Sequence, residues 1–294
     1  MPWRLPLFPL MEGDKIMKRV KSSALWWIAG TIGLVMISLA GSSPARAQGE
    51  KRTVFTERDF HWQGHLKAGQ TLEVINRNGG IDASTASGDA ASASGTWRHG
   101  DDSEPFVEVV EYPDGVTICA VYARDKNPGR CHRGGVSSES SSGWSWHGNR
   151  ASINFEVQVP KGVRLNALTT NGNVTGHNLA SVVEAATTNG NVDVATSEWA
   201  SASTTNGGVR VTMGNAKWSG ELKERTTNGS VDVTLPASAE FTLEAGTTNG
   251  GIHTDFQITV QGSLNLKRLS GTVGAGGRDL RVSTTNGGIK LTKS

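Results

Sequence analysis

Apolar and polar residues alternate along much of the chain, and the alternation keeps a fixed phase around a recurring tetrapeptide, Thr-Thr-Asn-Gly. Six copies occur, each followed by one small or polar residue and then Val or Ile. Around Asn189, for example, Val183 and Ala185 precede the tetrapeptide, and Val192 and Val194 follow it, with polar residues between. A period of two residues is typical of a strand with one buried face. The pattern therefore predicts an all-β protein.

The Asn-Gly pair of each copy is the predicted turn of the repeat, and a degenerate seventh pair lies upstream at Asn78 and Gly79. The six pairs are Asn171 and Gly172, Asn189 and Gly190, Asn206 and Gly207, Asn228 and Gly229, Asn249 and Gly250, and Asn286 and Gly287. From Asn to Asn the steps are 18, 17, 22, 21 and 37 residues. Because the last step is about two periods long, we expect a degenerate copy near residues 270–274.

Two folds fit this pattern. Asn-Gly favours a type I′ turn, which would make each copy a two-residue hairpin and the whole a hairpin-built β-sandwich. Alternatively, Asn-Gly forms the corner of a β-solenoid, similar to a parallel β-helix, in which each coil covers the apolar face of the next. The near-constant period favours the solenoid. A stacked Thr/Asn ridge could bind glycan or ice, but the uneven spacing argues against a flat, lattice-matched face.

The N-terminus resembles a secretory signal. From Met17 a basic segment precedes an apolar run over residues 24–40, and Ala45-Arg46-Ala47 is a small-x-small cleavage site. We expect residues 1–47 to be removed and the mature chain to start at Gln48, with residues 1–16 either an extension of the signal's N-terminal region or a misassigned start. An uncleaved membrane anchor is the alternative. No cysteine lies near the cleavage site, which argues against a lipid anchor.

Charge gives no indication of nucleic-acid binding. The full chain has 29 basic and 27 acidic residues. Residues 1–47 hold six of the basic and two of the acidic residues, so the remaining 247 residues carry 23 basic and 25 acidic residues, a net charge of −2. Nucleic-acid binding would require a basic patch.

Cys119 and Cys131 are the only cysteines, and both lie in the part expected to be exported. An oxidising compartment favours a disulfide between them. Closing a loop of about a dozen residues would stabilise the fold by about 3 kcal/mol. A redox pair would more often be spaced as Cys-x-x-Cys.

Two regions follow the signal segment. Residues 48–160 form a less regular β region, with strands predicted at 106–110, 116–122 and 153–160, the disulfide loop, and a Ser-rich loop at 137–148. Residues 161–294 form the regular repeat stack.

Together these segments resemble the bacterial "putative adhesin" family built on the DUF4097 domain. The resemblance rests on the Thr-Asn-Gly-x-Val steps, on residues 114–122 with the second cysteine at Cys131, and on residues 157–163, and it covers residues 70–294 as one domain. It implies a β-helix-like fold, an exported or envelope location and no established catalysis. The family supplies no functional residues to transfer.

Candidate chemical sites are few. His61 and His65 are four residues apart, but Gly64 and the strand-like flanks argue against a helical zinc pair. An acidic turn at residues 101–104 is more typical of a solvated surface than of a Ca²⁺ site. Asp193 and Asp232 recur at one outward repeat position, as solubilising residues do.

Two of the tryptophans are candidate contact residues. Trp144 and Trp146 lie in the Ser-rich loop and are candidate ligand-contact aromatics, because exposed Trp stacks on sugars or anchors protein contacts. Packing of that loop onto the stack is the alternative. Trp199 and Trp218 are expected to pack in the connections between repeats.

We therefore expect a non-enzymatic, exported β-solenoid that acts as a surface, periplasmic or secreted interaction module, without a cofactor. Its partner would be an envelope protein or a glycan, and a membrane only if the N-terminal segment is retained. One alternative is a glycan-binding or glycan-cleaving β-helix. Another is a membrane-anchored accessory of an envelope-stress or signalling system.

Overall fold

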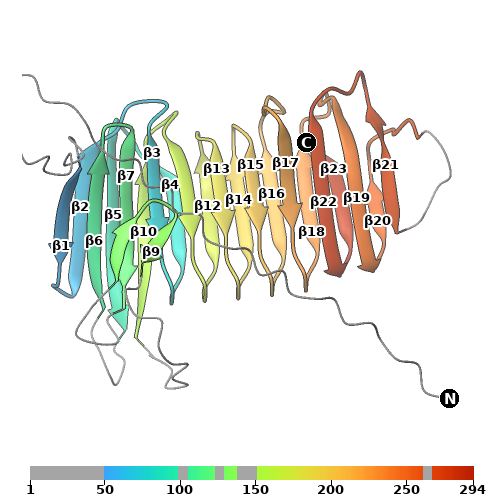
Figure 1. The fold of residues 1–294 in the computed structure, drawn as a ribbon. Helices are drawn as coiled ribbons and strands as arrows, with labels where there is room; N and C mark the ends of the chain where they lie inside the picture. The colour runs from blue at the N-terminus through green and yellow to red at the C-terminus, as the bar shows by residue number, and fades with distance from the viewer. Residues whose placement is uncertain (1–49, 99–104, 123–128, 138–150, 261–266) are drawn as a thin grey trace, which may run out of the picture. The chain divides into compact units, whose positions relative to one another are not determined.

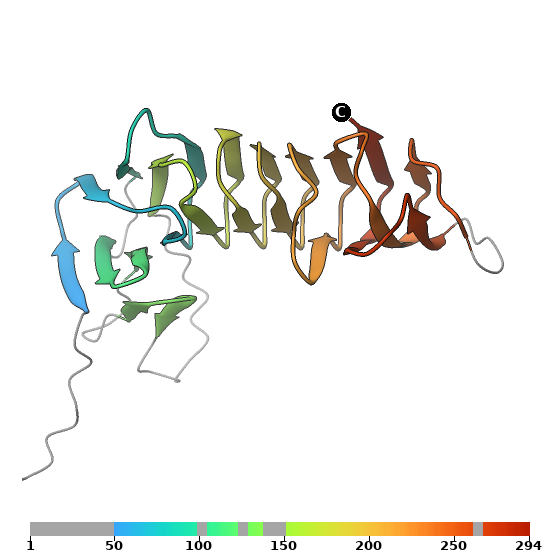
Figure 2. The same ribbon diagram turned by 90° about the horizontal axis from the view of Figure 1, so that it is seen from above.

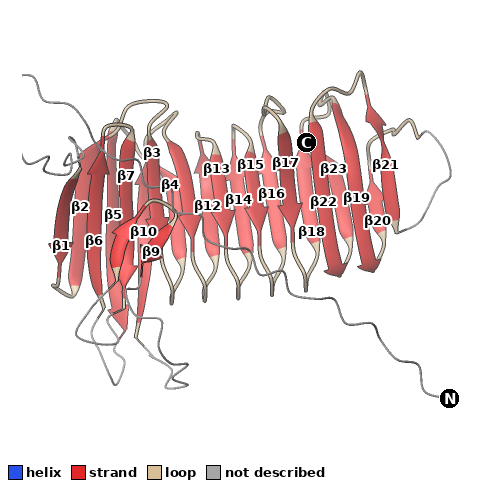
Figure 3. Cartoon of the chain, in the orientation of Figure 1, coloured by secondary structure: helices blue, strands red, loops and turns tan. Residues whose placement is uncertain are grey.

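The computed structural model describes residues 50–98, 105–122, 129–137, 151–260 and 267–294. The chain separates into two units, Met1–Arg46 and Ala47–Ser294, and all described residues belong to the second. The described residues form strands, turns and loops without a helix (Figure 3), as the alternation predicts. Among them no helix could cross a membrane. The predicted signal segment lies outside the described residues.

Two large sheets enclose the core between them (Figures 1 and 2). The first sheet has the spatial order β1 (Lys51–Phe55), β6 (Phe106–Tyr112), β7 (Gly115–Val121), β3 (Thr71–Ile75), β11 (Arg164–Leu168), β13 (Val183–Ala186), β15 (Ala200–Ser203), β17 (Glu221–Arg225), β22 (Asp279–Asn286), β19 (Phe241–Asn249) and β21 (Arg268–Val273).

The second sheet has the order β2 (Asp59–His65), β5 (Ala90–Arg98), β10 (Ser152–Val159), β4 (Ile81–Thr85), β12 (Val174–Leu179), β14 (Val192–Thr196), β16 (Val209–Met213), β18 (Val231–Leu235), β23 (Ile289–Lys293) and β20 (Ile252–Thr254). A small hairpin of β8 (Arg130–His132) and β9 (Gly135–Ser137) completes the described strands. The strands predicted in the less regular region appear as β6, β7 and β10.

Successive turns of the chain stack as parallel coils, each giving one strand to each sheet. The coil of β11 and β12 is followed in register by β13 with β14, β15 with β16, and β17 with β18. Val183, Ala185, Val192 and Val194 are all buried, as their phase predicts. The fold is therefore solenoid-like. The hairpin alternative is wrong for the repeats, because neighbouring copies pair in parallel.

The Asn-Gly corners are not type I′ turns. That turn needs a positive φ at both central residues, yet Asn178 is the only described residue other than glycine with a positive φ. The chain instead crosses from one sheet to the other at each Asn-Gly corner, where the Asn bridges in parallel to the Asn of the neighbouring coil.

The coils at the C-terminal end are stacked out of sequence order. β19 and β20 form the outermost coil, and β22 and β23 return to fill the position between that coil and the β17–β18 coil. The expectation of a degenerate copy near residues 270–274 is wrong, because these residues belong to or follow β21, which pairs antiparallel with β19. The long last step of the repeat is the path out to β21 and back.

Antiparallel strands and aromatic side chains close the two ends of the stack. β1 pairs antiparallel with β6, β2 with β5, and β21 with β19. At one end Phe60 makes edge-to-face contacts with Phe55 and Phe155, with ring centroids 5.1 and 6.1 Å apart. At the other, Phe241 and Phe256 pack edge to face at 5.4 Å. These caps cover the apolar faces that an open stack would expose.

Candidate interaction surface

The first Thr of each tetrapeptide is buried and ties its coil to the next. The Thr204 hydroxyl donates a hydrogen bond to the Gly190 carbonyl at 2.9 Å. The same bond recurs from Thr169 to Gly79, Thr187 to Gly172, Thr226 to Gly207, Thr284 to Gly229 and Thr247 to Gly287, at 2.8 to 2.9 Å. Each buried hydroxyl therefore finds a partner without interrupting the backbone ladder.

The glycine of the tetrapeptide is required by close approach of two coils. A Cβ built on Gly207 would lie 2.0 Å from the Gly190 carbonyl oxygen, and the φ of Gly207 is +152°. The same contact, at 1.8 to 2.1 Å, recurs at the other corners. Asn-Gly therefore marks these corners because the backbones nearly touch there.

The asparagines form one continuous ladder along this edge. Asn206 Nδ2 donates to Asn189 Oδ1 at 2.8 Å, and Asn228 Nδ2 donates to Asn206 Oδ1 at 2.8 Å. The ladder comprises, in spatial order, Asn78, Asn171, Asn189, Asn206, Asn228, Asn286 and Asn249, joined at 2.7 to 2.8 Å. We call it the asparagine ladder.

Exposed threonines accompany the asparagine ladder, at the second position of each tetrapeptide. Thr170, Thr188, Thr205, Thr248 and Thr285 are exposed, and Thr227 is half-buried. Stacked strands lie about 4.8 Å apart, so this edge repeats one polar pattern at a regular interval.

Uneven sequence spacing does not disturb that regularity, contrary to the sequence-based expectation. The extra residues of the 22-residue step between Asn206 and Asn228 lie in the connection between β16 and β17, at residues 214–220. That connection is at the opposite corner of the coil. The asparagines themselves stay bridged from coil to coil.

A groove of about 400 Å³ runs beside the asparagine ladder on the second sheet. The residues after two successive corners make a second, shorter ladder, in which Asn173 Oδ1 accepts the Asn191 N–H at 2.9 Å and Asn191 Oδ1 accepts the Gly208 N–H at 2.8 Å. Gly208 interrupts this second ladder because it has no side chain, and the groove forms there. Asp193, Arg210 and Asp232 stand side by side along it in register. Arg210 Nη1 lies 3.4 Å from Asp193 Oδ2.

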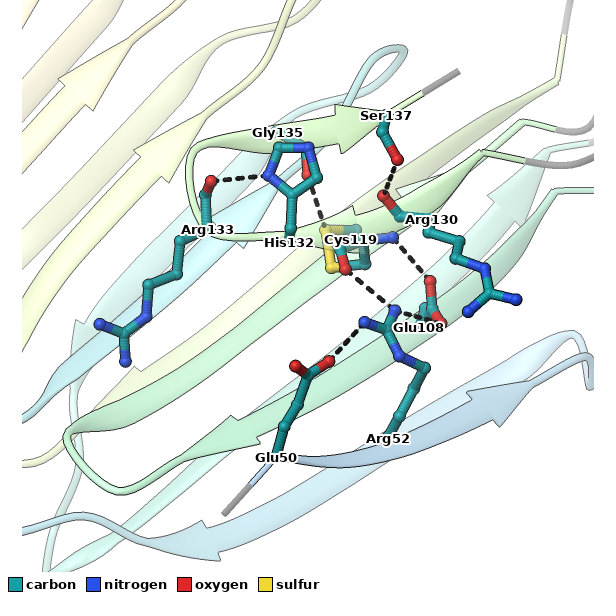
Figure 4. Close-up of polar contacts among 10 residues, drawn as sticks. Glu50, Arg52, Glu108, Cys119, Arg130, His132, Arg133, Gly135 and Ser137 are labelled. Atoms are coloured by element: carbon teal, nitrogen blue, oxygen red, sulfur yellow. Dashed lines mark hydrogen bonds and ion pairs between the residues drawn. A yellow bond between two sulfur atoms is a disulfide. The ribbon is translucent and has the colours of Figure 1, made fainter. Parts of the chain in front are cut away.

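The β8–β9 hairpin, which carries the disulfide, forms a separate polar cluster against β6 and β7 (Figure 4). Cys119 and Cys131 are bonded, with Cα atoms 5.7 Å apart, and attach the β8–β9 hairpin to β7. The buried Glu108 carboxylate accepts the Cys131 N–H at 2.7 Å and pairs with Arg52 Nη1 at 2.6 Å. Arg52 also donates to the Cys131 carbonyl at 2.9 Å. Burial of this carboxylate is thus compensated by charge and hydrogen bonds.

Arg133 holds the hairpin turn against the sheet. Its guanidinium pairs with Asp114 and lies 4.3 Å from the centroid of the Tyr112 ring. The hydrogen bond from Arg133 lowers the pKa of Asp114. Gly134 N–H donates to the buried Glu73 carboxylate at 3.2 Å, which also accepts from the Thr117 hydroxyl at 2.9 Å. These contacts account for the hairpin's fixed position.

One carboxyl group lies in the core itself. Glu224 is fully buried at an inward position of β17, beside Ala202 and Val282. Its Oε2 accepts the Ala202 N–H at 2.9 Å, and its Oε1 has no partner. Loss of solvation raises the pKa of Glu224 well above its ordinary value. Glu224 is not among the candidate residues predicted from the sequence, although the phase of the repeat places position 224 inward.

Other candidate residues are separated or outside the described chain. His61 and His65 both lie on β2 and are exposed. Four residues of strand span about 13 Å, which is too far for both to bind one ion. Trp218 is buried and donates from Nε1 to the Asp279 carbonyl at 3.0 Å, and Trp199 is half-buried against the core.

Several predicted positions fall outside the described residues. They are Trp144 and Trp146 in the Ser-rich loop and the acidic turn at 101–104. Within the described ranges, no group of three or more His, Cys, Asp or Glu side chains is arranged to hold a metal ion.

The chain is similar in sequence to one known protein family. A family model described as Toastrack DUF4097 matches residues 131–292, more than half of the chain. The match includes Cys131 and residues 157–163, and it begins after the 114–122 segment that the sequence resemblance also used. No curated protein matches the chain.

Three solved structures show similarity at low identity. The first is a "putative cell adhesion protein" from Clostridium sporogenes, with 10% identity, a TM-score of 0.43, and coverage of 80% of this chain and 100% of that one. The second is a "putative adhesin" from Bacteroides fragilis, with 11% identity, a TM-score of 0.32, and coverage of 80% and 97%. The third is a "putative lipid binding protein" from Parabacteroides distasonis, with 8% identity, a TM-score of 0.18, and coverage of 81% and 98%. Each of these names describes the solved protein that carries it and not the present chain.

Proposed function

The chain belongs to the Toastrack DUF4097 family, and from this premise we propose that it is an exported, non-enzymatic β-solenoid that acts as an interaction module of the cell envelope. The observation that carries the proposal is the asparagine ladder with its exposed threonines. One polar pattern repeated over seven stacked asparagines suits a partner that is itself extended or repetitive.

Two further observations support export. The N-terminal segment resembles a cleavable secretory signal. Cys119 and Cys131 form a disulfide, a bond that persists in oxidising compartments and is rare in the cytosol.

Binding to envelope material tests the interaction role. Purified protein would be sedimented with isolated cell envelope from the organism that makes it. Thr205→Lys places a long charged side chain on the ladder edge, whereas Thr212→Lys makes the same change on β16, at an exposed position outside the ladder edge. We expect wild type and Thr212→Lys to bind alike and Thr205→Lys to bind about tenfold more weakly, a loss of about 1.4 kcal/mol. Absence of wild-type binding, or equal binding by both variants, would contradict the proposal.

The groove beside the ladder favours a second candidate, a glycan-binding or glycan-cleaving protein. Asp193 and Asp232 flank Arg210 on neighbouring strands, so their backbones lie about 10 Å apart. Side chains at that distance can approach the separation of an inverting pair of carboxylates. Polysaccharide hydrolysis lost in both Asp193→Asn and Asp232→Asn would favour this candidate over the module. Unchanged hydrolysis in both variants would remove the two carboxylates from the reaction.

The membrane-anchored accessory is distinguished by the N-terminus. It needs the apolar run over residues 24–40 to remain attached. A chain that begins at Gln48 in the cell would remove this alternative.

A further inference from the structure

A pocket of about 350 Å³ opens on the first sheet, over β22, β19 and β21. This volume is at the lower end of the range for small-ligand sites, about 300 to 1,000 Å³. The three strands are neighbours only because β22 inserts between β17 and β19. The pocket is therefore a product of the exchanged coil order.

The hollow exists because small residues form its floor. Gly246 on β19 is paired with Ser283 on one side and Arg268 on the other. A Cβ built on Gly246 would meet no atom within 4 Å, and its φ is outside the left-handed region. A side chain would thus fit at Gly246 without strain, and the space above it is open.

Positive charge surrounds this floor. Lys267, Arg268 and Arg281 line the pocket, against one carboxylate, Glu244. Glu244 is already paired with Arg281, with Oε2 2.6 Å from Nη2. Lys267 Nζ donates to the Thr248 carbonyl at 2.9 Å.

The Arg268 guanidinium has no hydrogen-bond or ion-pair partner among the residues that the structure describes, and Arg268 is exposed. A guanidinium group binds a carboxylate through two parallel hydrogen bonds. The unpaired Arg268 therefore gives the pocket an available site for one anion.

We propose that this pocket binds a saccharide that carries one carboxylate, such as a uronic acid residue. Arg268 and Lys267 bind the carboxylate, the Ser283 hydroxyl donates to or accepts from the sugar hydroxyls, and the Glu244 carboxylate accepts hydrogen bonds from them. Glu244 also repels a doubly charged phosphate more than a singly charged carboxylate. The inference rests on the proposed function, because it names a ligand class for the same exported interaction module.

Calorimetric titration of the purified protein with a uronic acid oligosaccharide tests the proposal. The corresponding neutral oligosaccharide and inorganic phosphate are the comparison ligands. Arg268→Gln removes the unpaired cation, and Lys223→Gln removes one charge from an exposed position of β17 outside the pocket lining. Gly246→Val fills the hollow without changing charge, at a position where a strand tolerates a side chain.

We expect the acidic oligosaccharide to bind more tightly than the neutral one and than phosphate. Arg268→Gln should weaken binding about tenfold or more, Gly246→Val should abolish it, and Lys223→Gln should leave it unchanged. Equal affinity for the neutral sugar or for phosphate, or equal losses in Arg268→Gln and Lys223→Gln, would overturn the inference. Failure of wild type to bind the acidic oligosaccharide would overturn it too. Envelope binding that persists in such a case would leave the proposed function standing.

Discussion

Gly207 and Gly208 are adjacent in one corner, but replacing each with Ala should affect the free energy of unfolding differently. A methyl group at Gly207 would lie 2.0 Å from the Gly190 oxygen and 2.6 Å from its carbon, at a φ of +152°. At Gly208 the nearest atom would be Asn191 Oδ1 at 3.7 Å, an ordinary contact. Gly207→Ala and Gly208→Ala are therefore a matched pair of neighbouring substitutions that differ in the approach of the next coil and in the backbone φ.

The magnitude follows from what the clash would displace. The Gly190 carbonyl accepts the Thr204 hydroxyl at 2.9 Å, and the Gly190 N–H donates to the Asn206 carbonyl at 2.9 Å. Moving this backbone away weakens both hydrogen bonds, at about 1 kcal/mol each. Backbone strain at Gly207 adds about 1–3 kcal/mol. We expect Gly207→Ala to lower the free energy of unfolding by about 3–5 kcal/mol.

Gly208→Ala should be neutral or stabilising by about 0.4–1 kcal/mol, because it restricts only the unfolded chain. Urea unfolding followed by tryptophan fluorescence measures both variants against wild type. If the two variants unfold within about 0.5 kcal/mol of each other, the close approach of coils is not what requires glycine at this position.

Three further predictions concern the buried hydroxyl, the core carboxyl and the disulfide. Thr204→Val should lower the free energy of unfolding by about 1 kcal/mol in urea titrations, because the buried hydroxyl bond is lost, while Thr205→Val at the exposed position should change it by less than about 0.5 kcal/mol. Burial raises the pKa of Glu224 in the native state, so above about pH 4.5 the native protein keeps a proton that the unfolded chain has released. The free energy of unfolding therefore falls as pH rises above that value, by up to about 1.4 kcal/mol per pH unit. Glu224→Gln should therefore differ little from wild type in thermal stability at pH 4 and become progressively more stable than wild type towards pH 8; parallel profiles would show that the carboxyl is not protonated in the core. Reduction of the bond between Cys119 and Cys131 should cost about 3 kcal/mol of unfolding free energy, and an unchanged urea midpoint under reductant would contradict its structural role.

The inward and outward positions of the repeats could be predicted from the sequence because they depend on local alternation. Val192 and Val194 are buried, and Asp193 between them is not, as period two requires. The Thr-Thr-Asn-Gly corner was also located correctly, but the alternation alone left its type open between a type I′ turn and a solenoid corner. Asn-Gly satisfies both a type I′ turn and a corner where coils nearly touch, and only the neighbouring coil distinguishes them.

The order of the last two coils could not be predicted, because their inward faces are similar. Leu280 and Val282 of β22 are equivalent to Leu243 and Ala245 of β19, so either strand could stack on β17 by pattern alone. Long-range pairing decides between them. The pocket over Gly246 depends on which of these strands stacks on β17, so it could not be predicted from the sequence either.

The central claim, that this solenoid works outside the cytoplasm, is tested most directly by intact mass and N-terminal sequence of the protein recovered from cell fractions, with and without reductant. The account predicts a chain that begins at Gln48, found in periplasm, surface or medium fractions. Its mass should be lower by two hydrogen atoms than after reduction, because Cys119 and Cys131 are joined. A chain that keeps residues 1–47, carries free thiols and remains in the cytoplasmic fraction would contradict the account.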